Sequence, residues 1–259
     1  MTFLSVIILA VIQGLTEFLP VSSSGHLALA GMILKVPEGD ITFEIVVHLG
    51  TLMAVLAVYR KDLGELVIGI FRRKRESLVL AGLLIAGSIP AGLAGFLLAD
   101  SIEKSFDNPV IVSLMLLVTG CILFSTRFAK RGTRDNPNLI GSFIVGLSQA
   151  MALLPGISRS GFTISTGLFA GIRREKAARF SFLLSIPAIA GAAVLKLGDA
   201  VSSGIDVLLL ITGFAISALT GYFALMILLR FLKAGKFSVF AWYCWLLGLT
   251  GLTVALIGS

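Results

Sequence analysis

The sequence predicts an all-α polytopic membrane protein with an inverted-topology repeat, in which two broken or re-entrant helical segments meet in the membrane. Three observations support this fold class. The 259 residues are 57% hydrophobic and 14% charged, with a mean hydropathy of +1.01, which is far above that of soluble domains. Apolar stretches long enough to cross a bilayer recur along the chain, and two similar polar motifs interrupt them. We therefore expect a single integral membrane domain, 1–259, with repeat halves of about 1–126 and 127–259.

The membrane segments are expected where runs of roughly 17 to 25 apolar residues match the hydrocarbon thickness. The connections are too short to form a soluble domain, so any site must be built between helices. The first segment is apolar but broken at Pro20, which favours a segment that enters the membrane and returns. The expected apolar segments are 1–34, 43–59, 77–99, 108–126, 138–154, 180–197, 207–229 and 237–257.

The formal charge of +7 is distributed unevenly, because most of the 21 Lys and Arg residues fall in four connections. Connections rich in Lys and Arg stay on the cytoplasmic side, so the nearly neutral or acidic connections near Glu38, Asp107 and Asp206 are expected outside. This pattern predicts a multi-pass plasma-membrane protein with both termini extracytoplasmic, and it gives no reason to expect nucleic acid as a partner. The four basic connections are 60–76, 127–137, 173–179 and 230–236.

The two halves of the chain share a sequence pattern. Ile12-Gln-Gly-Leu-Thr-Glu17 leads to Pro20 and a Ser-Ser-Ser-Gly turn, and Ile144-Val-Gly-Leu-Ser-Gln149 leads to Pro155 and a Ser-Arg-Ser-Gly turn. The charges of the connections give the two halves opposite orientations. In inverted repeats of this kind, the broken helices meet near the middle of the membrane around a binding site.

Few ionisable side chains lie inside the apolar segments, and each is a functional candidate because an unpaired charge there is costly. Glu17, with Gln13 one helical turn before it, offers two oxygen ligands for a hard cation such as Mg²⁺ or Ca²⁺. The alternative is that Glu17 only neutralises Arg159 as a buried pair. Apart from the interfacial Lys196, the ionisable candidates in these segments are Glu17, His26, Glu44, His48 and Arg159.

The cluster around Arg159 predicts phosphate recognition. A guanidinium fork, several hydroxyl groups and a glycine that permits close approach of backbone amides together suit a phosphate, and a helix beginning here would add its dipole. Serine and glycine in membrane helices are often packing devices, but packing does not explain a buried arginine. The residues expected to bind phosphate here are Ser158, Arg159, Ser160 and Thr163.

The serine turn before His26 predicts the reacting group. The imidazole is suited to act as general acid or base or as nucleophile, unless it only forms a structural hydrogen bond to a carbonyl. Among the hydroxyls of the turn, those of Ser22 and Ser24 are expected to bind phosphate. Supporting roles around the site are expected for Glu44, His48 and Gln149.

Both motifs resemble those of the undecaprenyl-diphosphate phosphatase family, the bacitracin-resistance membrane phosphatases. The segment from Gln13 to His26 is similar to the family's Glu/Gln-x-x-x-Glu motif and serine turn, and Pro155 to Thr163 is similar to its Pro-Gly-x-Ser-Arg-Ser-x-x-Thr motif. The match covers essentially the whole chain. The resemblance implies hydrolysis of a C55 polyprenyl diphosphate to the monophosphate carrier lipid, assisted by a divalent cation, at a site open to the extracytoplasmic side.

The resemblance also implies roles for individual residues. It places Glu17 and Gln13 in the acidic or metal-associated motif, with Glu17 also catalytic. It places Ser23 and His26 in the catalytic turn, and Ser158, Arg159 and Thr163 in the phosphate-binding turn. Gln13 stands where many family members have a second glutamate, so the cation site has one carboxylate fewer.

Several mechanisms and one different function remain open from the sequence. We expect in-line attack of Ser23 on the terminal phosphorus with His26 managing protons, and the alternatives are attack by His26 or by an activated water. The alternative function is a transporter or flippase of an anionic polyprenyl phosphate, because secondary transporters also use inverted repeats with broken helices. Such a protein would tolerate loss of the Ser23 hydroxyl. The length of the polyprenyl tail and the formation of a homo-oligomer are open.

Overall fold

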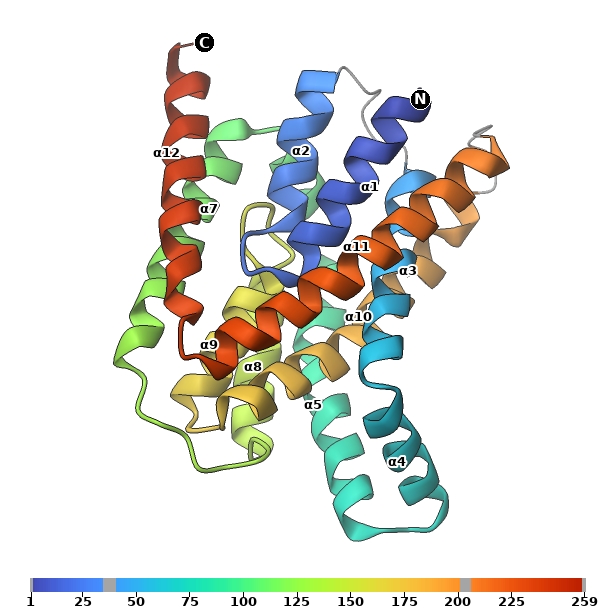
Figure 1. Ribbon diagram of the computed structural model, residues 1–259, viewed down its shortest axis with the longest axis vertical. Helices are drawn as coiled ribbons and strands as arrows, with labels where there is room; N and C mark the ends of the chain where they lie inside the picture. Colours follow the sequence, from blue (N-terminus) through green and yellow to red (C-terminus); the bar gives the residue numbers. More distant parts are fainter. Residues whose placement is uncertain (1, 35–40, 201–205, 258–259) are drawn as a thin grey trace.

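The computed structural model of the protein describes residues 2–34, 41–200 and 206–257. In these residues the chain is helical (Figure 1), with two short 3-10 turns and one isolated β-bridge between Arg134 and Ile172. The helices are α1 Phe3–Phe18, α2 Ser23–Leu34, α3 Ile41–Val58, α4 Arg60–Phe71, α5 Arg75–Leu97, α6 Ala99–Phe106, α7 Pro109–Ser125, α8 Leu139–Met151, α9 Arg159–Phe169, α10 Arg174–Ala200, α11 Val207–Lys233 and α12 Phe240–Ile257.

The long helices confirm the predicted class of an all-α polytopic membrane protein. Among the described residues, five helices are long and apolar enough to cross a membrane, namely α5, α7, α10, α11 and α12. Helices α3 and α4 form a further candidate span that is bent by 76° at Tyr59. Large apolar side chains remain exposed on the outer surface, such as Phe96 (76%) and Ile257 (81%). Contact with lipid explains this exposure, which would be unfavourable in water.

Two expectations about individual helices are wrong. Residues 138–154 do not form a span, because α8 has 13 residues, which at about 1.5 Å per residue reach only about 20 Å. Residues 60–71 are not a loop but the helix α4, because Leu63 and Leu66 pack against the main core and give the segment one buried side. The Lys and Arg residues around this segment concealed its apolar pattern. The connection at 99–106 likewise contains a short helix, α6.

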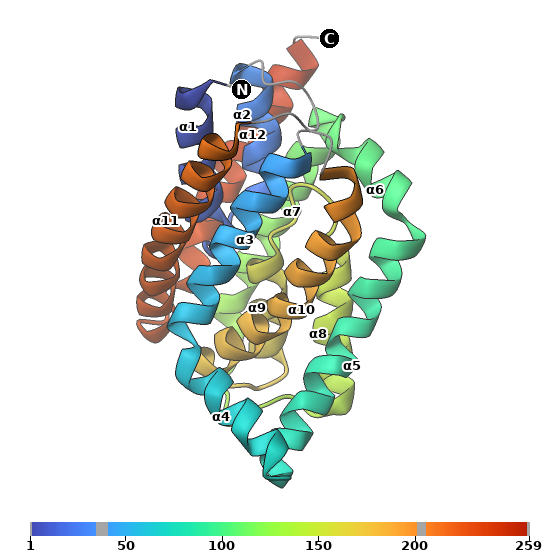
Figure 2. The same cartoon turned by 90° about the vertical axis from the view of Figure 1, so that its right-hand side faces the viewer.

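Helices α1 and α2 form one re-entrant pair, and α8 and α9 form another. Helix α1 begins at the end of the molecule where α12 ends, and α2 returns to that end (Figure 1). Helix α8 enters from the opposite end, where the connections α4–α5 and α7–α8 lie, and α9 returns there (Figures 1 and 2). The two pairs therefore run in opposite directions, as the inverted repeat predicts. The acidic residues Glu38 and Asp40, between α2 and α3 in the sequence, lie outside the described residues.

The repeat is also visible in how the first helix of each pair packs. Helix α1 packs along α11, and α8 packs along α5. The contact is made in both cases by the glycine of the repeated motif: a Cβ at Gly14 would lie 2.8 Å from the Ser217 carbonyl oxygen, and one at Gly146 would lie 2.3 Å from that of Gly87. Small residues allow membrane helices to approach this closely. The same sequence position thus makes the same kind of crossing in each half.

Replacement of Gly146 by alanine is expected to lower the unfolding temperature, because the new methyl group overlaps the α5 backbone and overpacking of this kind costs about 1–3 kcal/mol. The matched control is Gly82→Ala in α5, where no atom lies within 4 Å of the added Cβ. There the better helix propensity of alanine should leave stability unchanged or raise it. Thermal unfolding in detergent measures both. Equal unfolding temperatures for the two variants would contradict the close crossing.

Candidate active site

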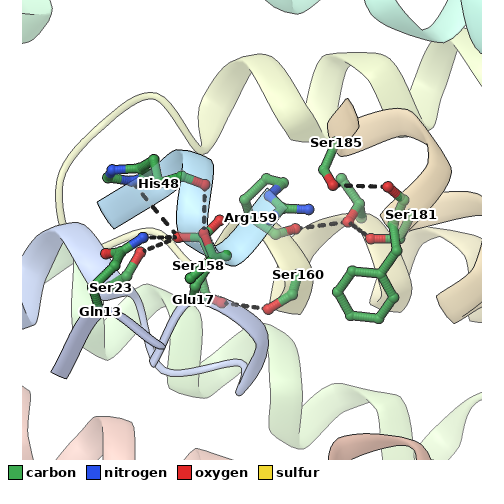
Figure 3. Close-up of polar contacts among 12 residues, drawn as sticks. Gln13, Glu17, Ser23, His48, Ser158, Arg159, Ser160, Ser181 and Ser185 are labelled. Atoms are coloured by element: carbon green, nitrogen blue, oxygen red, sulfur yellow. Dashed lines mark hydrogen bonds and ion pairs between the residues drawn. The ribbon is translucent and has the colours of Figure 1, made fainter. Parts of the chain in front are cut away.

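The ends of the two re-entrant helices meet in a buried ion pair (Figure 3). Arg159, the first residue of α9, donates from Nη2 to Oε1 of Glu17 in the last turn of α1 at 2.6 Å. The two side chains are 15% and 7% exposed. Next to Glu17, Phe18 is fully buried and packs edge-on against Phe182 of α10, with ring centroids 5.6 Å apart. This packing fixes the end of α1, so the carboxylate of Glu17 is held toward α9.

The second oxygen of Glu17 gathers three further polar groups. Its Oε2 accepts hydrogen bonds from Ser23 Oγ at 2.7 Å and from Gln13 Nε2 at 3.1 Å. His48 Nε2 lies 3.8 Å from the same oxygen. Because His48 Nδ1 lies 2.7 Å from the backbone carbonyl of Glu44, that nitrogen carries the proton and Nε2 is the nitrogen that faces Glu17. Glu17 is therefore the centre of a cluster drawn from α1, α2 and α3 in the first half of the chain and from α9 in the second (Figure 3).

The second motif forms a helix N-terminus whose local bonds are satisfied by its own hydroxyl groups. Ser158 caps α9, because its Oγ accepts from the amide of Gly161 at 3.1 Å and lies 3.2 Å from Ser160 Oγ. Thr163 Oγ1 donates to the Arg159 carbonyl at 2.7 Å and lies 2.5 Å from Ser181 Oγ of α10. The predicted helix start near Arg159 is thus confirmed, and Thr163 faces α10 instead of Glu17.

The turn before α9 is held by a residue that sequence reasoning missed. Thr119 of α7 donates from its hydroxyl to the Gly156 carbonyl at 2.9 Å and accepts from the Ser158 amide at 3.1 Å. Gly156 has a φ of 92°, and a Cβ there would lie 2.3 Å from the Val112 carbonyl oxygen. The backbone freed by the break is satisfied by protein, as the interior of a membrane requires. A threonine within an apolar span is too common to have signalled this role.

Two buried polar atoms without a partner lie beside the Glu17 carboxylate. Among the described residues, Arg159 Nη1 and Gln13 Oε1 are buried and make no hydrogen bond. Leaving such a group unpaired costs about 1–3 kcal/mol, so a native structure keeps it only for a reason. The two atoms belong to the residues on either side of the Glu17 carboxylate. Arg159 can therefore donate a hydrogen bond to an anion, and the free Oε1 of Gln13 can act as an oxygen ligand to a cation.

Comparison with known proteins identifies the family of the chain that carries this cluster. The family model described as Bacitracin resistance protein BacA matches residues 6–250. The chain belongs to this family. Relatives named undecaprenyl-diphosphatase include those of Moorella thermoacetica, 42% identical with 92% of each chain covered, Geobacter sulfurreducens, 40% identical with 87% of this chain and 88% of the relative covered, and Alcanivorax borkumensis, 43% identical with 90% and 91% covered. The resemblance drawn from the two motifs is thereby confirmed.

The other histidine of this BacA-family chain, His26, lies differently from the expected arrangement. Its Nδ1 lies 2.7 Å from the Ser22 carbonyl, and its Nε2 lies 2.7 Å from the Tyr243 hydroxyl of α12, with the two rings parallel at 5.6 Å. The hydrogen-bond partner of Ser23 is Glu17 and not His26. This contact between His26 and Tyr243 was not foreseen from the sequence.

The remaining predicted residues have supporting or separate positions. Ser22 has a φ of 68°, and its Oγ accepts from the Gly25 amide at 3.3 Å and lies 3.2 Å from Ser24 Oγ, so these two hydroxyls shape the serine turn. Glu44 is exposed and contributes its backbone carbonyl to His48. Gln149 is 3% exposed in α8, and neither polar atom of its side chain has a partner among the described residues. Of the residues with expected supporting roles, Glu44, His48 and Gln149, only His48 lies beside Glu17.

Proposed function

We propose that this chain hydrolyses a polyprenyl diphosphate, of the undecaprenyl type named for its relatives, to the lipid monophosphate and inorganic phosphate. The observation that carries the proposal is the contact of Glu17 with both Arg159 and Ser23, buried where the two broken helices meet. A buried arginine with a free Nη1 supplies the anion clamp, and a hydroxyl bonded to a carboxylate supplies the nucleophile with its base. A phosphatase that acts on a carrier lipid needs both the anion clamp and the activated nucleophile within the membrane.

The proposed reaction starts with binding of the diphosphate. Its terminal phosphate takes hydrogen bonds from Arg159 and from the hydroxyl and amide groups at the start of α9, where the helix dipole favours negative charge. The polyprenyl tail stays in lipid. Binding separates Arg159 from Glu17 in part, which leaves the carboxylate free to act on Ser23.

The proposed chemical step uses the hydrogen bond between Ser23 and Glu17. The Ser23 oxygen attacks the terminal phosphorus in line while its proton passes to Glu17, and the bond from that phosphorus to the bridging oxygen breaks, which releases the lipid monophosphate. Water then attacks the phosphoserine, the bond from phosphorus to Ser23 Oγ breaks, and Glu17 returns its proton to that oxygen, so that inorganic phosphate leaves with both protons of the water. His48 lies 3.8 Å from Glu17 and is placed to share its proton. Positioning and charge compensation provide most of the rate, because phosphoryl transfer has little covalent chemistry to assist.

The residues fit a divalent cation that takes most of its ligands from the substrate. Mg²⁺ is usually held by one or two carboxylates together with phosphate oxygens and water. Glu17 and the unpartnered Oε1 of Gln13 would hold it, and it would offset the charge of the diphosphate. No group of three or more His, Cys, Asp and Glu side chains in the described part of the chain is suited to hold a metal ion by itself.

Chelation is expected to reduce phosphate release strongly, and added Mg²⁺ or Ca²⁺ should restore it. Because the cation depends on phosphate ligands, the protein without substrate should bind it only weakly. Gln13→Glu restores a second carboxylate and should lower the cation concentration needed for half-maximal activity by roughly tenfold. Phosphate release from purified protein, titrated with each cation in metal-free buffer, measures both effects. Full activity in the presence of chelator would contradict the need for a cation. The same result would still demonstrate hydrolysis, because the assay measures phosphate release directly.

The site is proposed to open to the extracytoplasmic side, with both termini on that side. The support is the charge of the connections, because the basic ones lie at the end of the molecule opposite the start of α1 and the end of α12 (Figure 1). Single cysteines at Asp107 and at Arg131, both exposed positions, should differ in a background with Cys121 and Cys244 replaced. In intact cells Asp107→Cys should react with an impermeant thiol reagent and Arg131→Cys should not. The reverse pattern would invert the orientation.

A further inference from the structure

A basic cavity lies where the connection between α7 and α8 meets the turn between α9 and α10. Its volume is about 480 Å³, and its lining is formed by residues 128–134 and 168–171. Volumes of this size are typical of sites for small ligands. None of the residues of the Glu17–Arg159 cluster lines it. The cavity is therefore a feature separate from the proposed active site.

The walls of the cavity are fastened to each other. The backbone amides of Thr133 and Arg134 both donate to the Gly171 carbonyl, at 3.0 and 3.1 Å, and the Arg173 amide donates to the Arg134 carbonyl at 2.9 Å. These bonds form the isolated β-bridge between the two connections. The cationic side chains of this loop are thus presented from a fixed backbone.

In the part of the chain that the structure describes, three cations around the cavity are unpaired. Lys130, Arg131 and Arg134 are exposed, and within the described residues their side chains make no ion pair or hydrogen bond. Asp135, the acidic residue that follows, is already paired with Arg173. Three free cations around one cavity favour an anion with several oxygens, and arginine in particular favours phosphate.

The rim of the cavity is apolar. Phe128 is 74% exposed and Phe169 is 52% exposed, and both line the cavity beside the cations. Cations next to exposed aromatic rings match the boundary between a lipid head group and its acyl chains. We propose that this cavity binds an anionic phospholipid, with the phosphate on Lys130, Arg131 and Arg134 and the acyl chains along the two phenylalanines.

This lipid site goes beyond the proposed hydrolysis and does not depend on it. Helix α9 links the two places, because its first residue is Arg159 and its last, Phe169, lines the cavity. A lipid bound here holds the far end of the helix that carries the phosphate clamp. We expect the bound lipid to raise the unfolding temperature.

The test compares two triple variants with the same loss of charge. Lys130→Gln, Arg131→Gln and Arg134→Gln together remove the cavity cations. The control, Lys74→Gln, Arg72→Gln and Arg75→Gln, removes one lysine and two arginines from the exposed α4–α5 connection at the same end of the molecule (Figure 1). Native mass spectrometry measures binding of phosphatidylglycerol and phosphatidylcholine, with inorganic phosphate as a competitor. Size-exclusion profiles and thermal unfolding show that each variant is folded.

Wild type and the control should bind one phosphatidylglycerol in preference to phosphatidylcholine, and millimolar phosphate should not displace it. Each cation near an anionic lipid changes affinity by about fivefold, so the cavity variant should bind roughly 100-fold more weakly and Arg131→Gln alone about fivefold. An equal loss in the control would show that only diffuse surface charge attracts the lipid. Displacement by phosphate would show a site for free phosphate, and absence of a lipid preference in wild type would also overturn the proposal.

Discussion

Arg159→Lys is expected to reduce phosphate release by at least about 100-fold while the protein stays folded. Lysine keeps the charge and can still pair with Glu17, but it cannot use one nitrogen toward the carboxylate and a second, the present Nη1, toward a phosphate. Loss of one preorganised donor to a developing negative charge typically lowers turnover by about 10²–10³. The assay is phosphate release from a polyprenyl diphosphate in detergent, with size-exclusion chromatography as the check on folding.

The matched control for this change is Arg173→Lys. Arg173 is also ion-paired, with Asp135, but its side chain is 53% exposed and it lies outside the cluster. Its replacement should leave turnover within about twofold, because exposed ion pairs contribute little. If Arg159→Lys instead retained nearly normal turnover, the assignment of Arg159 as the phosphate clamp would be wrong.

Ser23→Ala is expected to abolish detectable phosphate release, a loss of at least about 10³-fold, because the nucleophile is removed. Binding of the diphosphate should be largely kept, since Arg159 and the start of α9 remain in place. Ser88→Ala in α5 is the control, because among the described residues the Ser88 hydroxyl bonds only to the Leu84 carbonyl of its own helix. Single-turnover phosphate release and binding of a labelled substrate separate the two effects.

His26→Ala distinguishes the rival mechanisms. If Ser23 attacks, this change should slow turnover through the lost contacts to Ser22 and Tyr243 without removing the covalent step. If His26 attacks, Ser23→Ala should keep measurable hydrolysis, and an acid-labile phosphohistidine should be trapped. Substantial hydrolysis by both single variants would reject both nucleophiles. A wild-type protein without activity on polyprenyl diphosphates of several lengths would favour transport.

The meeting of the two motifs was predictable because burial makes each charge expensive. An arginine and a glutamate inside apolar segments need partners, and few candidates exist in such a chain. Pro20 and the serine and glycine around it likewise indicated a break, and the charge of the connections indicated opposite orientations. These features depend on composition and local pattern, which a sequence states directly.

The contacts within the site were not predictable, because they depend on how helices rotate and cross. Nothing local to Ser23 shows that its hydroxyl bonds to Glu17 and that His26 turns toward Tyr243 on the last helix. The close partner His48 is brought in by the packing of α3. The apolar run 138–154 is long enough for a span, but α8 ends at Met151 and a turn follows it. Apolar content alone does not show where a helix ends.

The pairing of Glu17 with Arg159 has a consequence for how the proposed reaction cycle ends. A carboxylate and a phosphate present similar oxygens to a guanidinium, so without substrate Glu17 occupies the place that a phosphate oxygen would take. The Glu17 carboxylate is therefore a surrogate anion for Arg159. A weakly charged molecule cannot displace the Glu17 carboxylate from Arg159, whereas a diphosphate can. Once the reaction has split that charge between two products, Glu17 competes for the arginine again and helps to expel inorganic phosphate.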